Sequence, residues 1–182
     1  VTKSAGWQEA LGIFNMGAEL RPVAGGGICQ VATTVYRGLV NAGFPVIERR
    51  NHSLYVGYYE KYGVGIDSTI FPGHQDLVFV NDTPSFLLIQ AYADGYDAYV
   101  NIFGTNDGRS VTLEGPYFAS TAPEDLRVNN RKLSKSEIVW IQRVEYANGS
   151  VLQNAIVSRY KELPKNIVAK FGQTTLHAAG NG

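Results

Sequence analysis

The feature that most constrains this chain is a run of three glycines, Gly25 to Gly27, placed directly before a predicted helix. Glycine adopts positive φ angles easily and lets another chain segment approach closely. From Val31 to Asn41 the apolar side chains recur at i, i+3 and i+4, which predicts an amphipathic helix. Gly43 is expected to end this helix in a left-handed conformation, and Pro45 prevents its continuation.

The chain's only cysteine, Cys29, falls in the first turn of this predicted helix. Free backbone N–H groups and the helix dipole stabilise a thiolate at such a position. In an arbitrary domain a lone cysteine is usually a small buried apolar side chain. The position of Cys29 just after three glycines favours a nucleophile instead. One cysteine cannot form an internal disulfide, so it does not identify a redox compartment.

Composition limits the class of protein. Sixteen basic and sixteen acidic side chains cancel, so no net charge favours nucleic acid or an anionic membrane. With 182 residues, 45% of them hydrophobic, the chain suits one globular domain, alone or with an appendage. No stretch approaches the roughly 18 consecutive apolar residues that span a bilayer. Since the chain starts at Val1 with no signal segment, we expect a processed or excised fragment.

The remaining chain is predicted to be rich in strands. A short helix is expected at residues 7–14, before the glycines. Turn residues at 81–84 and 105–108 suggest hairpin loops, so the middle region is interpreted as a β meander. The predicted strands of this region cover residues 44–50, 53–59, 66–70, 77–80, 86–92, 97–103 and 110–114.

A polar segment near residue 120 suggests a boundary in the chain. Residues 120–135 are polar, contain Pro123 and show little periodicity. Beyond them, two predicted strands (137–146 and 151–160) flank Asn148-Gly149, a strong hairpin signal. We therefore divide the chain into residues 1–120 and residues 121–182, the second part being a linker, a C-terminal β-hairpin and a tail. The hairpin is either an extension or a return to the main sheet, and residues 178–182 are expected to fray.

Several segments of the chain resemble the VanW family, named for an accessory protein of B-type vancomycin-resistance clusters. They are the glycine–cysteine run GGGICQVATTVY (25–36), AGFPVIER (42–49), NHS (51–53), DST (67–69) and DLVFVNDT (76–83). The resemblance covers about residues 5–120, and the final hairpin and residues 157–161 are also similar to what often follows the family's domain. It implies a bacterial cell-envelope protein that is secreted or membrane-anchored outside the cell.

The match to the VanW pattern has two departures. Family members commonly carry a histidine where this chain has Arg50, so that ring cannot be essential here. The segment 58–65 also differs from the usual proline- and glycine-containing approach to the aspartate.

A weaker resemblance suggests a chemistry. The order Cys29, His52, Asp67 is similar to that of transglutaminase-like and papain-like proteins, which place a cysteine at a helix start and a histidine and an aspartate on strands. This resemblance implies an α+β fold in which one main helix packs on a largely antiparallel sheet, in a transglutaminase-like or papain-like core, followed by the C-terminal hairpin.

We assign the predicted site residues on this basis. Cys29 is the nucleophile, His52 takes its proton, and Asp67 holds the imidazole tautomer and supports its charge. Alternatively, His52 is a hydrogen-bonding residue at a strand end, Asp67 makes an ordinary turn, and Asp76 is a competing orienter. The predicted binding residues are Gly26, Gly27, Gln30 and Ser53.

No metal or cofactor is expected. A metal held by Cys29, His52 and His74 would lack a closely spaced pair of ligands. A phosphate-binding loop would need the Lys and Ser/Thr that are missing after the glycines. The many tyrosines either pack on strands or stack on sugar rings.

These residues lead to a functional hypothesis with alternatives. The chain is interpreted as a cell-envelope cysteine acyltransferase or amidase that acts on peptidoglycan stem peptides or another wall peptide. The alternative is a noncatalytic wall-binding or scaffold module, whose glycine-rich helix start would bind a carboxylate or hold the fold. A module that only scaffolds a partner protein predicts a large exposed apolar patch. The oligomeric state is left open.

Overall fold

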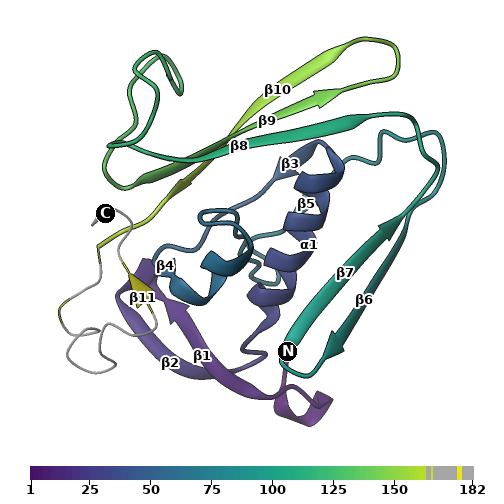
Figure 1. The fold of residues 1–182 in the computed structure, drawn as a ribbon. Helices are drawn as coiled ribbons and strands as arrows, with labels where there is room; N and C mark the ends of the chain where they lie inside the picture. Colours follow the sequence, from purple (N-terminus) through teal and green to yellow (C-terminus); the bar gives the residue numbers. More distant parts are fainter. Residues whose placement is uncertain (163–164, 166–175, 178–182) are drawn as a thin grey trace.

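The computed structural model describes residues 1–162, 165 and 176–177. A central helix, α1 (Ile28–Ala42), is surrounded by short antiparallel strands (Figure 1). The strands before the middle of the chain are β1 (Glu9–Phe14), β2 (Glu19–Ala24), β3 (Val46–Glu48), β4 (Tyr55–Val56) and β5 (Val78–Phe79). Those after it are β6 (Leu88–Asp94), β7 (Asp97–Phe103), β8 (Ser110–Phe118), β9 (Glu137–Glu145), β10 (Val151–Arg159) and β11 (Leu176–His177). Three 3₁₀ turns are η1 (Lys3–Ala5), η2 (Asn15–Gly17) and η3 (Gly57–Tyr62).

The glycines at both ends of α1 act as the sequence predicts. Gly27 is the N-cap with φ +94°, and Gly43 is the C-cap with φ +73°, so the helix start and end are confirmed. Gly26 lies so close to β1 that a Cβ there would come within 2.6 Å of the Ala10 backbone nitrogen. The glycine run therefore lets β1 pack against the start of the helix, and Cys29 lies in the first turn as expected.

The predicted fold class is wrong. Instead of one sheet with a helix packed on it in a transglutaminase-like core, the described strands form five separate antiparallel sheets. One of these sheets has three strands, in the order β10-β9-β8, and each of the other four has two.

The predicted meander fails because its turns join strands of different sheets. Residues 81–84 lead from β5, which pairs with β3, to β6, which pairs with β7. Residues 105–108 lead from β7 to β8, which pairs with β9. Turn chemistry fixes a local change of direction, but it does not decide which strands pair.

Three predictions of local secondary structure also differ from the structure. The helix expected at 7–14 is largely the strand β1, which forms a hairpin with β2. The strand expected at 66–70 is reduced to a bridge between Arg50 and Thr69. The strand expected at 53–59 is split into β4 and η3.

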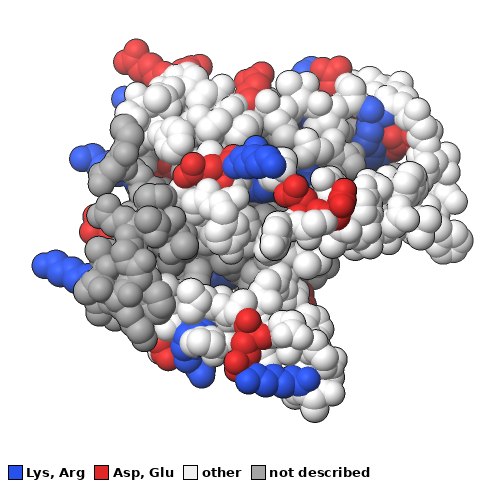
Figure 2. All heavy atoms as spheres, turned by 60° about the horizontal axis from the view of Figure 1, so that its bottom comes forward, with Lys and Arg blue, Asp and Glu red and all other residues white. Residues whose placement is uncertain are grey.

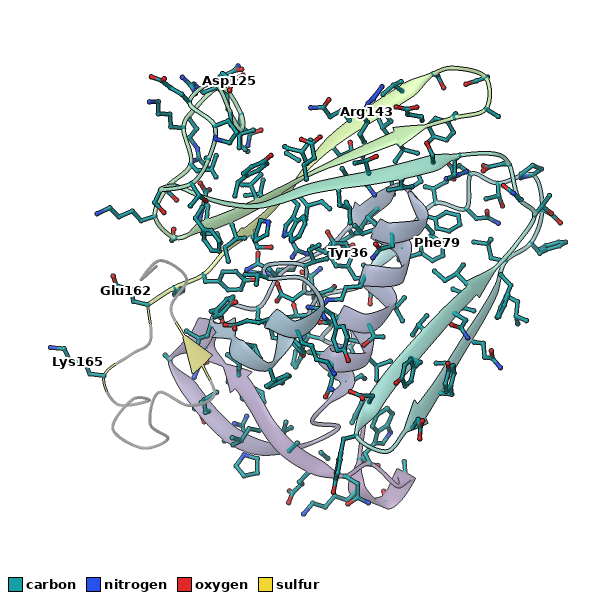
Figure 3. All side chains as sticks on the ribbon, viewed as in Figure 1. Tyr36, Phe79, Asp125, Arg143, Glu162 and Lys165 are labelled. Atoms are coloured by element: carbon teal, nitrogen blue, oxygen red, sulfur yellow. The ribbon has the colours of Figure 1, made fainter. Side chains whose placement is uncertain are left out.

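The C-terminal hairpin forms as predicted, with β9 and β10 paired along nine residues each. Figure 1 shows it as part of a three-stranded sheet that crosses the C-terminal half of α1. Gln142 of β9 donates to the Val40 carbonyl of α1 at 2.7 Å. Arg143, the next residue, lies on the face turned away from α1 (Figure 3). The sheet joins β8 to strands beyond residue 120, and the tail predicted at 178–182 lies outside the described residues.

The buried apolar side chains form small clusters around α1 rather than one core. One cluster centres on Tyr36, which faces the middle of the molecule (Figure 3), and includes Val40, Ile66 and Ile156. A second contains Leu20, Leu54, Val56 and Tyr59, and a third contains Tyr55, Ile138 and Tyr160.

We predict that Gly43→Ala destabilises the fold more than Gly73→Ala. Both glycines have a positive φ, +73° and +80°, so alanine costs about 1–2 kcal/mol at either position through backbone strain. A Cβ at Gly43 would also lie 2.7 Å from Val111, whereas a Cβ at Gly73 would meet nothing within 4 Å. Urea unfolding of both variants measures the difference. Equal losses would show that the contact between α1 and the three-stranded sheet is loose.

Candidate active site

A buried aspartate holds His52 by two hydrogen bonds. His52 Nδ1 lies 2.6 Å from Asp67 Oδ2, and the His52 backbone N–H donates to the same oxygen at 2.7 Å. His52 is 6% exposed and Asp67 is 2% exposed. Because Nδ1 is bonded to the carboxylate, Nε2 is the ring nitrogen left for another partner.

Cys29 brings its sulfur to this imidazole from the start of α1. The thiol is partly exposed and donates to the Ile70 carbonyl at 3.5 Å. Burial disfavours the thiolate, but hydrogen bonds with His52 and with the Ile70 backbone and the charge of the His52 imidazolium outweigh burial and hold the pKa of Cys29 below 9.0. The structure therefore brings Cys29, His52 and Asp67 together.

The electrostatics of the three groups favour a charged pair. Burial alone would lower the pKa of His52, but hydrogen bonds with Asp67 and Cys29 raise it to about 9. Burial likewise opposes ionisation of Asp67, but His52 and Arg49 hold the pKa of its carboxyl below the usual value. The opposite pKa shifts of Cys29 and His52 favour a thiolate–imidazolium pair more than isolated side chains would, with Asp67 ionised behind it.

Thr33 fastens α1 to the segment that carries Asp67. Its hydroxyl donates to the Ser68 carbonyl at 3.0 Å and accepts from the Ser68 backbone N–H at 3.1 Å. Both residues are fully buried. Since Thr33 lies four residues after Cys29, the same helix face positions the sulfur and clamps the segment beside Asp67.

Arg49, which directly follows β3, forms hydrogen bonds with Asp67. Its Nε donates to the Asp67 carbonyl at 2.6 Å, and its Nη2 lies 3.3 Å from Asp67 Oδ1. The guanidinium also lies over the ring of Tyr36, 4.8 Å from its centroid. Tyr160 donates its hydroxyl to the same Oδ1 from the end of β10.

The comparisons with known proteins agree with the sequence resemblance. The family model described as "VanW like protein" matches residues 1–103. The chain belongs to the VanW family. It is also 28% identical over 125 residues to the uncharacterized protein YoaR of Bacillus subtilis (strain 168). That alignment covers 69% of this chain and 40% of YoaR, so the chain matches less than half of this relative's length. No solved structure matches the chain.

The VanW region and the site do not coincide. Cys29, His52 and Asp67 lie within residues 1–103, but Tyr160 lies beyond them. Thr33, Arg49 and Tyr160 were missed as site residues by sequence reasoning. Arg49 carried a usable signal, since it is a positive charge at the end of a predicted strand, two residues before Asn51-His52-Ser53.

Of the four predicted binding residues, two are exposed near Cys29 and two have contacts elsewhere. Gly27 and Gln30 are exposed at the helix start, beside Cys29 in the chain. Gly26 is taken up by its contact with β1. Ser53 turns its hydroxyl toward Gly17, and its carbonyl accepts from the Lys161 N–H at 2.8 Å. Gly27 and Gln30 thus remain the better placed for a ligand at Cys29.

Other polar candidates lie outside the site. His74 is exposed and stacks on Phe71, with the ring centroids 5.1 Å apart. Asp76 is exposed and its N–H donates to Glu48, so the carboxylate bonded to His52 is that of Asp67. Within residues 1–162, 165 and 176–177, no group of three or more His, Cys, Asp or Glu side chains is arranged to hold a metal ion.

The face of the molecule drawn in Figure 2 is mixed in charge. Figure 2 shows acidic and basic side chains interspersed over the visible face, with no broad field of one sign. Among the described residues, no helix has both the length and the apolar character to cross a membrane. Two shallow hollows lie away from Cys29, one between α1 and β7 and one beside the turn that joins β9 and β10.

We predict that Asp67→Asn lowers the pKa of His52 and that Asp76→Asn does not. In the native chain the pKa of His52 is raised to about 9, so the ring keeps its proton through neutral pH. Without the carboxylate, burial dominates and the pKa should fall by more than about one unit. NMR titration of the imidazole carbons measures this. An unchanged His52 pKa in Asp67→Asn would contradict the assigned ion pair.

Proposed function

We propose that this VanW-family protein is a cell-envelope cysteine acyltransferase or amidase that acts on peptidoglycan stem peptides or another wall peptide. The observation that carries this proposal is the His52–Asp67 contact at 2.6 Å beside a partly exposed Cys29 whose pKa is lowered. A nucleophile, a base and an orienting carboxylate in this relation support acyl transfer. The link to vancomycin resistance in the family name supports a substrate in the cell wall.

The proposed reaction begins with attack of the Cys29 thiolate on an amide carbonyl carbon. A carbon–sulfur bond forms, the carbon–nitrogen bond breaks, and the His52 imidazolium gives its proton to the leaving amine. Water or an amine then attacks the thioester carbonyl carbon and gives a proton to His52. The carbon–sulfur bond breaks, and the Cys29 thiolate is restored. Water as the acceptor makes the protein an amidase, and an amine makes it a transferase.

The start of α1 offers a donor for the oxyanion of this reaction. The backbone N–H groups of Ile28, Gln30 and Val31 are bonded to carbonyls of Gly25 and Gly27. Among the described residues, the Cys29 N–H has no such acceptor. It lies next to the attacking sulfur, where the negative charge on the carbonyl oxygen develops.

A second candidate, a noncatalytic wall-binding or scaffold module, is favoured by a separate surface. The hairpin of β6 and β7 stands beside α1 in Figure 1, and every residue of β6 is exposed. Large apolar side chains are exposed along and around it: Phe86, Leu88, Ile89, Tyr92, Tyr96, Tyr99 and Phe103. An exposed apolar surface of this kind is typical of a docking surface.

We predict that Cys29 is alkylated by iodoacetamide with a pH midpoint below 9.0 and that His52→Ala raises this midpoint. The variant removes the hydrogen bond and the charge of His52, which lower the pKa, and leaves burial, which raises it, and the hydrogen bond to Ile70, which lowers it. A rise of about one pH unit or more is expected. His74→Ala is the matched control, because it removes an exposed imidazole outside the site. A midpoint that His52→Ala leaves in place would remove the catalytic assignment.

The Cys29→Ala variant distinguishes the enzymatic function, which it should abolish, from wall binding, which it should leave unchanged. We expect the native chain to cleave or transfer amide bonds of purified peptidoglycan peptides and Cys29→Ala to lose this activity by at least about a thousandfold. Mass spectrometry of the peptides detects either product. If the native chain binds purified wall without changing any peptide and Cys29→Ala binds equally, the noncatalytic module is the function.

A further inference from the structure

The C-terminal hairpin places a buried phenol at the candidate site. Tyr160 follows β10, is 3% exposed, and donates its hydroxyl to Asp67 Oδ1. We propose that Tyr160 is a positioning residue that fixes the Asp67 carboxylate toward His52, so that the hairpin outside the VanW match completes the catalytic unit. This inference rests on the proposed function, because it assigns Tyr160 a part in the same site.

The two oxygens of Asp67 have separate partners. Oδ2 accepts from both the ring and the backbone of His52. Oδ1 accepts from Tyr160 and, at 3.3 Å, from Arg49. Rotation of the carboxylate would break bonds on both sides at once. Without the phenol, Oδ1 would keep only the longer contact with Arg49, so the carboxylate that orients the imidazole would be less firmly held.

Tyr160 is itself held in place on several sides. Its backbone N–H donates to the Ser136 carbonyl at 3.0 Å, and its ring meets Tyr55 edge-on with centroids 5.2 Å apart. The same ring belongs to the buried cluster that contains Ile138 of β9. Burial and the nearby Asp67 charge raise the pKa of Tyr160, so its hydroxyl stays protonated and able to donate. The phenol is therefore a fixed donor.

The chain around Tyr160 runs beside the segment that carries His52. Asn51 donates its amide to the Arg159 carbonyl at 2.7 Å. On the other side of Tyr160, Lys161 forms a bridge with Leu54. The hairpin is thus attached to the chain on both sides of His52, which is the arrangement that a positioning role needs.

Strand β10 also packs behind Asp67. Arg49 Nη1 donates to the Val157 carbonyl at 3.0 Å, and Arg49 Nη2 donates to Ser158 Oγ at 2.6 Å. Ser158 in turn donates to the Gly65 carbonyl at 2.5 Å. The contacts of Asp67 therefore draw on residues 49 to 160, whereas the family match ends at residue 103.

The test compares Tyr160→Phe with Tyr146→Phe in the full chain. Tyr146 follows β9 in the same hairpin and bonds to a different aspartate, Asp82, at 3.2 Å, so its variant removes an equivalent contact away from the site. The readouts are the proton resonance of His52 Nδ1–H at neutral pH and the pH midpoint of Cys29 alkylation. The charged and titratable groups that act on Asp67 or feel its charge are Cys29, Tyr36, Arg37, Arg49, His52, Tyr55 and Tyr160.

A positioning role predicts in which direction the His52 Nδ1–H resonance and the Cys29 midpoint move. In Tyr160→Phe the loosened carboxylate should move the Nδ1–H resonance upfield, speed its exchange with water, and raise the Cys29 midpoint by about half a pH unit or more. Tyr146→Phe should match the native chain. A downfield move would mean that the phenol only withdraws charge from Asp67, and an unmoved resonance would mean that it only packs. Either result overturns the proposal.

The outcome is separable from that of the proposed function. If His52→Ala shifts the Cys29 midpoint and Tyr160→Phe does not, the positioning role fails and the proposed function stands. If neither variant shifts it, both fail. Should Tyr160→Phe not fold, 3-fluorotyrosine at position 160 keeps the ring and makes the hydroxyl a stronger donor. A more firmly held carboxylate should slow the exchange of the His52 Nδ1–H proton with water, and an unchanged or faster exchange overturns the proposal.

Discussion

The rest of the structure depends on one buried carboxylate, that of Asp67. A carboxylate that is 2% exposed is strongly unfavourable unless cations and donors surround it. Here the donors come from distant parts of the chain: Arg49 after β3, His52 in the following loop, and Tyr160 after β10. Satisfying this single group therefore requires segments that are far apart in sequence to meet. Helix α1, the segment from Arg49 to His52 and the end of β10 meet at this point.

The same requirement explains why several small sheets suffice. Each two-stranded sheet buries little apolar surface, and isolated hairpins of this size are marginal in water. The polar contacts of Arg49 and Thr33 join the helix, the loop with Asp67 and strand β10 into one unit. Buried polar networks of this kind specify a unique arrangement when every member is satisfied. Near the end of the segment from Arg49 to Asp67, the carbonyls of Gly65 and Asp67 accept hydrogen bonds from the side chain of Arg49.

The sequence was informative where one local pattern determined the outcome. The caps Gly27 and Gly43 and the Asn148-Gly149 turn each need a backbone conformation that glycine allows, so α1 and the hairpin of β9 and β10 could be predicted. Strand pairing could not, because residues 81–84 and 105–108 look like hairpin turns but join different sheets. Partner choice depends on burial by distant residues, which no local turn signal contains.

In the candidate site, too, residues marked by a sequence pattern were predicted, and residues defined only by distant contacts were not. Cys29 was placed by its helix start, and His52 and Asp67 by an order of residues along the chain, and the structure brings these three together. Tyr160 lies 93 residues from Asp67, and a tyrosine at the end of a strand has many ordinary uses. Thr33 on α1 looked like any polar helix residue. Both contacts exist only in three dimensions, so a single sequence could not separate them from background.

The pKa shifts of Cys29 and His52 also make the stability of the fold depend on pH, in opposite directions. The pKa of His52 rises from 6.5 to about 9, so its stabilisation is complete below pH 6.5 and is lost as the pH rises through 9. The pKa of Cys29 falls below 9.0, so its stabilisation is complete above pH 9 and is lost as the pH falls through the lowered value. Between the lowered pKa of Cys29 and about pH 9 the two windows overlap, and there folding favours a proton on His52 and its loss from Cys29. The two slopes oppose each other there, so the dependence of stability on pH that either group alone would cause is reduced.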